Sequence, residues 1–253
     1  MRIITPLNVT RLAQKVVLRP HRGSTWSMDL SMDGRVLMVG SYEHDNLGGR
    51  ASGLLSKRAR IVTATEAGHP ENLVGGGRGY VELWRLQDAT LLGQLPGWDD
   101  APWGTAISPD GSFAAAVDGN TPAFKLWTTA YLLPVRRVEV PLGHQPYCLA
   151  FTPSGKTVAT GGSSGDIRLW NWRGGNPEVR YSLAAHDLFV SAVAFSPNGL
   201  FLASGDDTGL LRLWDIGFDF TPKVRWELKS RDQIVDIHFS SDGTMLEAAS
   251  WDV

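Results

Sequence analysis

Residues 190–216, VSAVAFSPNGLFLASGDDTGLLRLWDI, decide the fold of this chain. Apolar and polar residues alternate along this stretch, and two turn-forming segments at 197–199 and 206–209 interrupt the alternation. A period of two residues is typical of half-buried strands, and Asn-Gly between two such runs favours a tight turn. The stretch therefore predicts three antiparallel strands, the last at residues 210–214.

The same pattern recurs along the chain with a constant period. Each turn between the first two strands carries a dipeptide ending in Gly, and the spacings are 77, 44, 44 and 44 residues: Asp33-Gly34, Asp110-Gly111, Ser154-Gly155, Asn198-Gly199 and Asp242-Gly243. The tryptophan that closes the third strand recurs at spacings of 43, 43 and 44 residues: Trp84, Trp127, Trp170 and Trp214. Two independent markers with one period indicate a repeat architecture.

These units resemble the WD-repeat family, in which each repeat is one four-stranded blade of a β-propeller with typical GH and WD dipeptides. The resemblance is carried by His186 before the first strand and by Trp214-Asp215 at the end of the third. It implies an all-β fold, a β-propeller of about five four-stranded blades. It also implies a single WD-repeat domain over residues 1–253.

The two ends of the chain fall inside one repeat. Residue 253 follows the second strand of the fifth unit, and residues 2–5 and 13–18 stand where a third and a fourth strand would fall. Together the ends would complete one shared blade and close the ring without an exposed edge. The alternative is a truncated part of a seven-bladed propeller, because WD-repeat rings usually have seven blades. The sequence leaves both possibilities open.

One long insertion interrupts the first unit at about residues 41–79. Gly34 and Trp84 are 50 residues apart, whereas Gly199 and Trp214 are 15 apart, so about 35 residues are extra. The inserted segment is rich in Gly and polar residues, with a short apolar piece at 61–64. We predict a long, partly ordered loop that overhangs the mouth of the central channel.

Composition limits the classes of partner. The 24 Lys and Arg residues nearly balance the 26 Asp and Glu residues, and a net charge of −2 argues against a dominant nucleic-acid footprint. Cys148 is the only cysteine, so it cannot form an internal disulfide. There is no apolar run of the length that crosses a bilayer. We therefore expect a cytoplasmic protein that binds neither nucleic acid nor membrane.

The resemblance also implies buried polar sets inside the blades. In this family a His, a Ser or Thr, an Asp and the Trp form one hydrogen-bonded set. The third and fourth units supply the structural blade residues His144, Thr160, Trp170, His186, Ser204 and Trp214. Six residues before each Trp, where the resemblance places the Asp, stand Ser164 and Thr208. We therefore predict that both sets are incomplete, and in the second unit Trp98 stands in place of the His.

A row of aromatic residues marks the predicted binding surface. Seven residues before each turn residue stand Trp26, Trp103, Tyr147, Ser191 and Val235, and Phe189 lies two residues before Ser191. The resemblance places this position at the channel mouth, on the face that commonly binds partners. We predict that Trp26, Trp103, Tyr147 and Phe189 contact a partner, because clustered aromatic residues are frequent interface hot spots. The alternative is that these rings only pack between blades.

These observations predict a non-enzymatic protein–protein interaction scaffold that binds a protein or peptide on the channel-mouth face. We expect no catalytic residue, no metal and no cofactor, because His44, Asp45 and His69 are spaced too irregularly for zinc. The alternative is a propeller enzyme or small-ligand sensor that uses the channel mouth and the 41–79 insertion, with Glu66 among its residues. We expect a monomer if the ring closes and a strand-exchanged oligomer if it does not.

Overall fold

The computed structural model describes residues 24–250, except 32–33, 45–76, 96–97, 99–100, 131–132, 174–175 and 218–221. All regular elements of this part are strands, which form four four-stranded antiparallel sheets and one two-stranded sheet, here called blades 1 to 5. Blade 1 contains β1 (Ser24–Leu30), β2 (Val36–His44), β3 (Gly77–Arg85) and β4 (Thr90–Leu95). Blade 2 contains β5 (Pro102–Ile107), β6 (Phe113–Asp118), β7 (Ala123–Ala130) and β8 (Leu133–Pro141). Blade 3 contains β9 (Pro146–Phe151), β10 (Thr157–Gly162), β11 (Asp166–Arg173) and β12 (Asn176–Ala184). Blade 4 contains β13 (Val190–Phe195), β14 (Phe201–Asp206), β15 (Leu210–Asp215) and β16 (Lys223–Lys229), and blade 5 contains β17 (Ile234–Phe239) and β18 (Leu246–Ser250).

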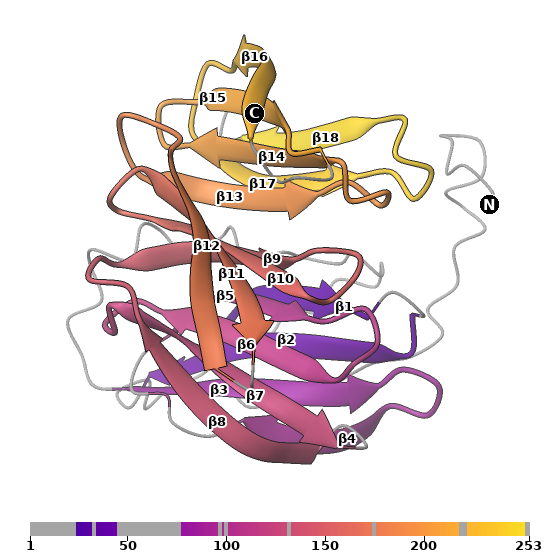
Figure 1. Ribbon diagram of the computed structural model, residues 1–253. Coiled ribbons are helices and arrows are strands. Elements are labelled where there is room, and N and C mark those ends of the chain that lie inside the picture. Colours follow the sequence, from indigo (N-terminus) through magenta and orange to yellow (C-terminus); the bar gives the residue numbers. More distant parts are fainter. Residues whose placement is uncertain are drawn as a thin grey trace, which may run out of the picture.

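The first strands of the blades lie next to one another at the centre of the molecule. β5 contacts both β1 and β9, and β13 contacts both β9 and β17, whereas the fourth strands lie at the periphery (Figure 1). β17 also approaches β1, because the charges of Asp236 and His238 both affect the pKa of Asp29. We call the end at which the inner strands begin the channel-mouth face, and the end at which they finish the opposite face.

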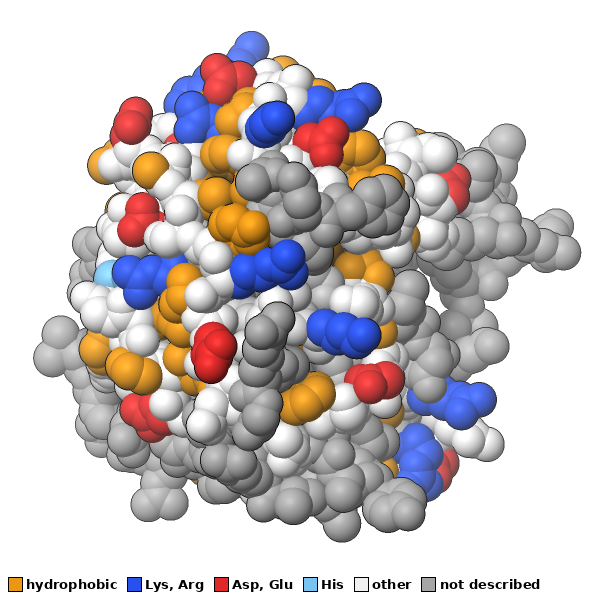
Figure 2. All heavy atoms as spheres, in the orientation of Figure 1, with side chains coloured by type: hydrophobic (Ala, Val, Ile, Leu, Met, Phe, Trp, Pro, Cys, Tyr) orange, Lys and Arg blue, Asp and Glu red, His pale blue; other side chains and the backbone are white. Residues whose placement is uncertain are grey.

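The outer strand of blade 4 is exposed along its whole length. Val224, Trp226 and Leu228 are 48%, 39% and 61% exposed, and Figure 2 shows hydrophobic, basic and acidic side chains interspersed over the upper part of the molecule. The equivalents of the last two in β12, Tyr181 and Leu183, instead pack against the core between blades 3 and 4. The predicted strands at 2–5 and 13–18 lie outside the described residues, so closure and truncation both stay predictions.

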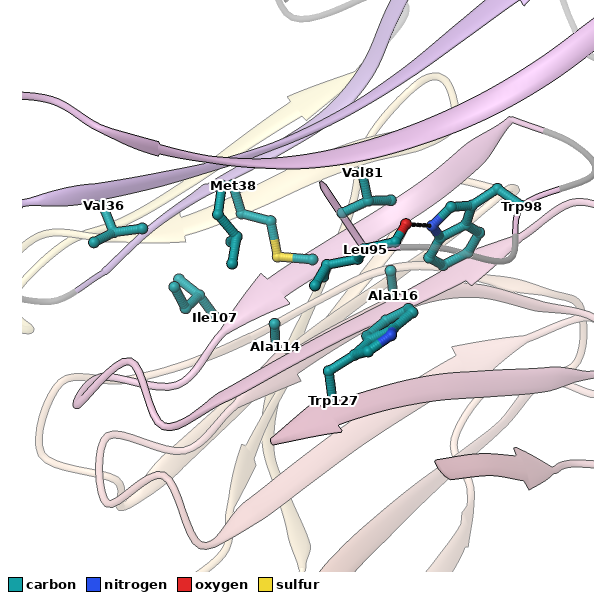
Figure 3. Close-up of a cluster of buried hydrophobic side chains, with 10 residues drawn as sticks. Val36, Met38, Val81, Leu95, Trp98, Ile107, Ala114, Ala116 and Trp127 are labelled. Carbon is teal, nitrogen blue, oxygen red and sulfur yellow. Dashed lines mark hydrogen bonds between the residues drawn. The ribbon is translucent and has the colours of Figure 1, made fainter. Parts of the chain in front are cut away.

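The hydrophobic core is divided into clusters that lie between neighbouring blades. The cluster between blades 1 and 2 joins Met38 and Leu83 to Ala114 and Trp127, and similar clusters fill the next three interfaces (Figure 3). In blades 2, 3 and 4 the second strand is covered on both faces, and β10 is buried at every residue. The sheets therefore pack face to face, which makes burial between repeats the main source of stability.

The turns between first and second strands confirm the repeat marker. In blade 4, Gly199 has a φ of +71°, a left-handed conformation that glycine adopts without steric cost. The Asn198 side chain accepts hydrogen bonds from the Leu200 amide at 3.0 Å and from the Ser196 hydroxyl at 2.7 Å. The same conformation occurs at each described turn glycine: Gly34, Gly111, Gly155 and Gly243. The period of the dipeptides is thus the period of a specific turn.

The strands that flank the insertion are longer than the sequence suggested. We predicted that they end at residue 40 and restart at residue 80, but β2 continues to His44 and β3 begins at Gly77. Their pairing continues in register from Ser41 opposite Tyr80 to His44 opposite Gly77. The two strands thus extend past the approximate boundaries 41 and 79, because polar and Gly-rich residues here continue the ladder, and the insertion itself stays a prediction. Residues 45–76, including Asp45, Glu66 and His69, lie outside the described part.

Candidate functional site

Each inner strand has a β-bulge near its start, at the third residue of β1 and at the second residue of β5, β9, β13 and β17. The pairing register shifts at one residue in each blade, and that residue is left without a partner in the ladder: Trp26, Trp103, Tyr147, Ser191 and Val235. These are the five positions that the spacing from the turns selected. A bulge bends the strand and re-aims the side chain of the extra residue. The bulge is thus the local feature that distinguishes these side chains from the rest of each inner strand.

Three aromatic side chains from consecutive blades contact one another at the channel-mouth face. The ring centroids of Trp103 and Tyr147 are 5.0 Å apart with an interplanar angle of 25°, which is a stacked arrangement. The rings of Tyr147 and Phe189 are 5.5 Å apart at 71°, which is an edge contact. Aromatic pairs of these kinds contribute about 0.5–1.5 kcal/mol beyond their burial. We call Trp103, Tyr147 and Phe189 the aromatic row.

All three residues of the aromatic row are partly exposed, so their rings pack on one another and still present surface to solvent. Trp26 occupies the equivalent position in β1, and its side chain lies outside the described part. At the fourth position the bulge residue is Ser191, whose hydroxyl donates to the carbonyl of Ile234 in blade 5. The row therefore runs over blades 2, 3 and 4, and its fourth-blade member comes from just before the strand.

A set of charged side chains in the first and fifth inner strands, Asp29, Asp236 and His238, was not predicted from the sequence. Asp29 accepts hydrogen bonds from the amides of Ile107 in blade 2 at 2.8 Å and of Leu30 at 2.9 Å. Burial raises the pKa of Asp29 to about 6, against the effect of these two amides. A hydrogen bond to Asp236 at 3.0 Å raises the pKa of His238. Asp29 therefore titrates closer to neutral pH than an ordinary carboxyl group, and the charged form of His238 is favoured.

A signal for this group was present in the repeats. Asp29 and His238 each stand four residues before a turn residue, where the three middle units have Ala106, Ala150 and Ala194.

No cluster of three potential metal ligands occurs among the residues that the structure describes. Cys148 is buried in β9, and burial raises the pKa of its thiol to about 12, so the thiol stays protonated at neutral pH.

The buried set of blade 4 is complete, which corrects the prediction that its Asp is missing. His186 Nδ1 lies 2.9 Å from Asp206 Oδ2 and its Nε2 lies 2.7 Å from Ser204 Oγ, which also accepts from Trp214 Nε1 at 2.9 Å. The carboxylate stands eight residues before Trp214, not six. The residue at the expected place, Thr208, donates its hydroxyl to the other oxygen of Asp206 at 2.7 Å.

The protonation states in this set follow from its geometry. Burial lowers the pKa of His186, against the opposing effect of Asp206, so the ring is neutral at pH 7. Burial alone would raise the pKa of Asp206, but hydrogen bonds from Thr208, Leu210 and His186 outweigh it and lower that pKa. Nδ1 of His186 must then donate to the carboxylate, and Nε2 accepts from the Ser204 hydroxyl.

The corresponding set of blade 3 is only partly assembled. Trp170 Nε1 donates to Thr160 Oγ1 at 2.9 Å. His144 instead lies 3.4 Å from its neighbour's carbonyl through Nδ1, and its buried Nε2 has no hydrogen-bond partner. The reason is that Gly162 occupies the place of the blade 4 carboxylate, so no acceptor holds the imidazole ring in position.

Blade 2 has different buried polar contacts in place of the His-containing set. Trp98 stands where the His is in blades 3 and 4, and the ammonium of Lys125 lies 4.3 Å from the centre of its ring. That ammonium also lies 2.5 Å from Asp118, and both side chains are buried. Trp98 Nε1 donates to the Leu95 carbonyl at 2.7 Å. A buried ion pair and a cation–π contact thus replace the His–Asp–Ser hydrogen-bonded set of blade 4.

One donor in blade 2 is left unsatisfied. Trp127 Nε1 is buried without an acceptor, because Ala116 occupies the position of the Ser204 and Thr160 hydroxyls (Figure 3). Ala116→Ser should restore the acceptor and raise the free energy of unfolding by about 1 kcal/mol. Urea unfolding of both proteins measures this, with Ala114→Ser, on the same strand, as the destabilised control. A loss of stability in Ala116→Ser similar to that of the control would contradict the assignment.

A protein-family model matches two segments of this chain. The model of the family described as WD domain, G-beta repeat, matches residues 136–171 and 177–215. Each match extends from the fourth strand of one blade through the first three strands of the next. The two matches end in the blades that carry His144 and His186. A search of curated proteins finds no match to this chain. No helix of the described part is long and apolar enough to cross a bilayer.

Proposed function

We propose that this chain is a non-enzymatic scaffold that binds a protein or peptide on the channel-mouth face. The proposal proceeds from the premise that the chain carries repeats of the WD-repeat family. The observation that carries the proposal is the aromatic row, in which three partly exposed rings from three blades contact one another. Trp and Tyr are the side chains most often found as interface hot spots. Rings held by stacking lose little conformational entropy on binding, which favours affinity.

The framework beneath the row supports the same proposal. Inner strands are tied to neighbouring blades by side chains, since Ser27 Oγ donates to the Pro102 carbonyl at 3.1 Å and Cys148 Sγ donates to the Val190 carbonyl at 3.6 Å. Gly104 sits where a Cβ would come within 3.1 Å of the Tyr147 carbonyl. The bulge residues are therefore positioned by a tightly packed ring of strands, and such a surface binds with little rearrangement.

We also propose a cytoplasmic location and a protein partner in preference to nucleic acid. Charges of both signs are interspersed on the face shown in Figure 2, which suits a protein partner better than a polyanion. The alternative, a propeller enzyme or small-ligand sensor using the insertion, depends on His44, Asp45 and Glu66, whose side chains lie outside the described part. Testing the aromatic row separates the scaffold from that alternative.

Removal of one ring from the row should abolish most of the binding. Peptides selected from a random displayed library on the full chain should bind Trp103→Ala about 30-fold more weakly than wild type, because a hot-spot truncation costs about 2 kcal/mol or more. Fluorescence anisotropy of a labelled peptide gives the dissociation constants. The matched control is Trp226→Ala, another partly exposed tryptophan on the outer strand of blade 4.

The control should bind each peptide within twofold of wild type. Urea unfolding of both variants must show a single cooperative transition, so that loss of binding is not loss of folding. Selected peptides whose affinity is the same for wild type and Trp103→Ala would contradict the proposed site, as would an equal loss in Trp226→Ala.

A further inference from the structure

A second surface feature lies on the opposite face, away from the aromatic row. A pocket of about 580 Å³ opens between blades 1 and 2, where the inner strands end. The described residues that line it come from the turns of both blades, and those that bear on its chemistry are Ser31, Arg35, Val36, Arg85, Pro109 and Asp110. A pocket of this volume has room for a small organic ligand.

The charged groups among the described lining residues are the guanidinium groups of Arg35 and Arg85 and the carboxylate of Asp110. The carboxylate of Asp110 is already engaged, because its Oδ1 accepts from the Ser108 hydroxyl at 2.7 Å, the Ser112 amide at 3.0 Å and the Ser112 hydroxyl at 2.8 Å. The turn therefore stabilises the charge of Asp110, and the described lining residues place the guanidinium groups of Arg35 and Arg85 beside it.

Arg85 can bind an additional acceptor. Its Nη1 donates to Asp88 at 3.0 Å, and the two side chains are 44% and 46% exposed. An exposed ion pair is weak, so it does not hold the guanidinium against a competing anion. A guanidinium has five N–H donors in a planar fork that matches the oxygens of a phosphate or a carboxylate.

The pair of arginines is specific to blade 1. The residue after the turn glycine is Arg35 in blade 1, and the equivalents in the other blades are Ser112, Lys156, Leu200 and Thr244. The residue after the closing tryptophan is Arg85 in blade 1, and its equivalents are Thr128, Asn171 and Asp215. The repeat itself therefore does not require these two charges, so they need another explanation.

At the next three blade interfaces, the turns of neighbouring blades are in contact on this face. A Cβ on Gly155 would lie 3.5 Å from the Pro109 ring, and the same contact measures 3.7 Å between Gly199 and Pro153 and 3.5 Å between Gly243 and Pro197. The turn of blade 1 has no proline at this position, since its sequence is Ser31-Met32-Asp33. In blades 2, 3 and 4 the turn proline thus lies against the turn glycine of the following blade.

We propose that this pocket binds a small ligand whose oxyanion, a phosphate or a carboxylate, is held by Arg35 and Arg85 while an apolar portion contacts Val36 and Pro109. Val36 is buried at the base of blade 1, and the pocket offers apolar surface beside the two cations. Oxyanion binding by paired guanidiniums is strongest where water is partly excluded, as in a pocket.

Phenyl phosphate and benzoate are suitable probes, because each joins one oxyanion to one apolar ring, and benzyl alcohol is the neutral control. In ¹H–¹⁵N spectra of the full chain, at least one anion should shift the amides of residues 34–36, 85–88, 108 and 110–112 in a saturable way. Saturation by phenyl phosphate alone assigns a phosphate ligand, and saturation by benzoate alone assigns a carboxylate.

The double variant Arg35→Gln/Arg85→Gln should weaken binding of the saturating probe at least tenfold. Arg225→Gln is the matched control, because Arg225 forms a similar exposed ion pair with Asp215, with side chains 55% and 49% exposed. Its affinity should equal that of wild type. The proposal is overturned if neither anion saturates, if benzyl alcohol gives the same shifts, or if the double variant binds as wild type does. None of these outcomes depends on the aromatic row.

Discussion

Replacing Asp118 with Ala is expected to lower the free energy of unfolding by about 3–5 kcal/mol, the usual cost of breaking a buried ion pair on one side. The Lys125 ammonium would remain inside blade 2, where its side chain is 5% exposed and 2.5 Å from the lost carboxylate. The cation–π contact with Trp98 at 4.3 Å would be its main remaining favourable interaction. Urea unfolding followed by tryptophan fluorescence measures the change.

A double-mutant cycle identifies the cause of this loss. Lys125→Met alone leaves the carboxylate of Asp118 bonded to the amides of Asn120 and Thr121 and to the Thr121 hydroxyl, so it should cost less than Asp118→Ala. The variant that carries both substitutions should be more stable than Asp118→Ala alone, because it removes the unpaired buried charge. A double variant no more stable than Asp118→Ala, or a loss below about 1 kcal/mol in Asp118→Ala, would contradict the ion-pair account.

Asp206→Ala is expected to cost about 3 kcal/mol or more, because one carboxylate organises both the buried set and the following turn of blade 4. It binds His186 and accepts from the amides of Thr208 and Leu210, each at 2.9 Å. Each net hydrogen bond is worth about 0.5–1.5 kcal/mol, and those to a charged group more. Thermal or urea unfolding gives the change.

The neighbouring residue provides the control for this prediction. Asp207→Ala removes a carboxylate whose Oδ1 is buried without a hydrogen-bond partner and whose pKa is raised by burial and by the charge of Asp206. It should therefore leave stability unchanged or slightly higher. Equal losses in Asp206→Ala and Asp207→Ala would mean that the turn, and not the hydrogen-bonded set, is what both substitutions disturb.

Much of the fold could be predicted because short sequence features within each repeat determine its strands and turns. A turn glycine and a closing tryptophan recur at one period, and each depends on residues within one blade, so spacing alone located the strands. The aromatic positions could be found in the same way, since the bulge lies a constant seven residues before the turn. The contact between Trp103 and Tyr147 could not, because it depends on how adjacent blades pack.

Several errors share one physical origin. Asp206 was overlooked because the family position was counted back from Trp214, whereas the side chain reaches His186 from the end of β14. The ion pair between Lys125 and Asp118 could not be predicted for a similar reason, because a lysine in an alternating strand pattern is expected to face solvent. Contacts between strands and between blades decide these cases, and the sequence of a single repeat does not contain them.

The measurement that tests the central claim most directly is hydrogen exchange of the full chain with and without the tightest selected peptide. Binding on the channel-mouth face predicts slowed exchange at the starts of the inner strands of blades 2, 3 and 4, in residues 103–105, 147–149 and 189–192. Exchange at the opposite-face turns, 108–112 and 240–244, should stay unchanged. Protection confined to those turns or to the outer strand β16, with none beside the aromatic row, would contradict the account.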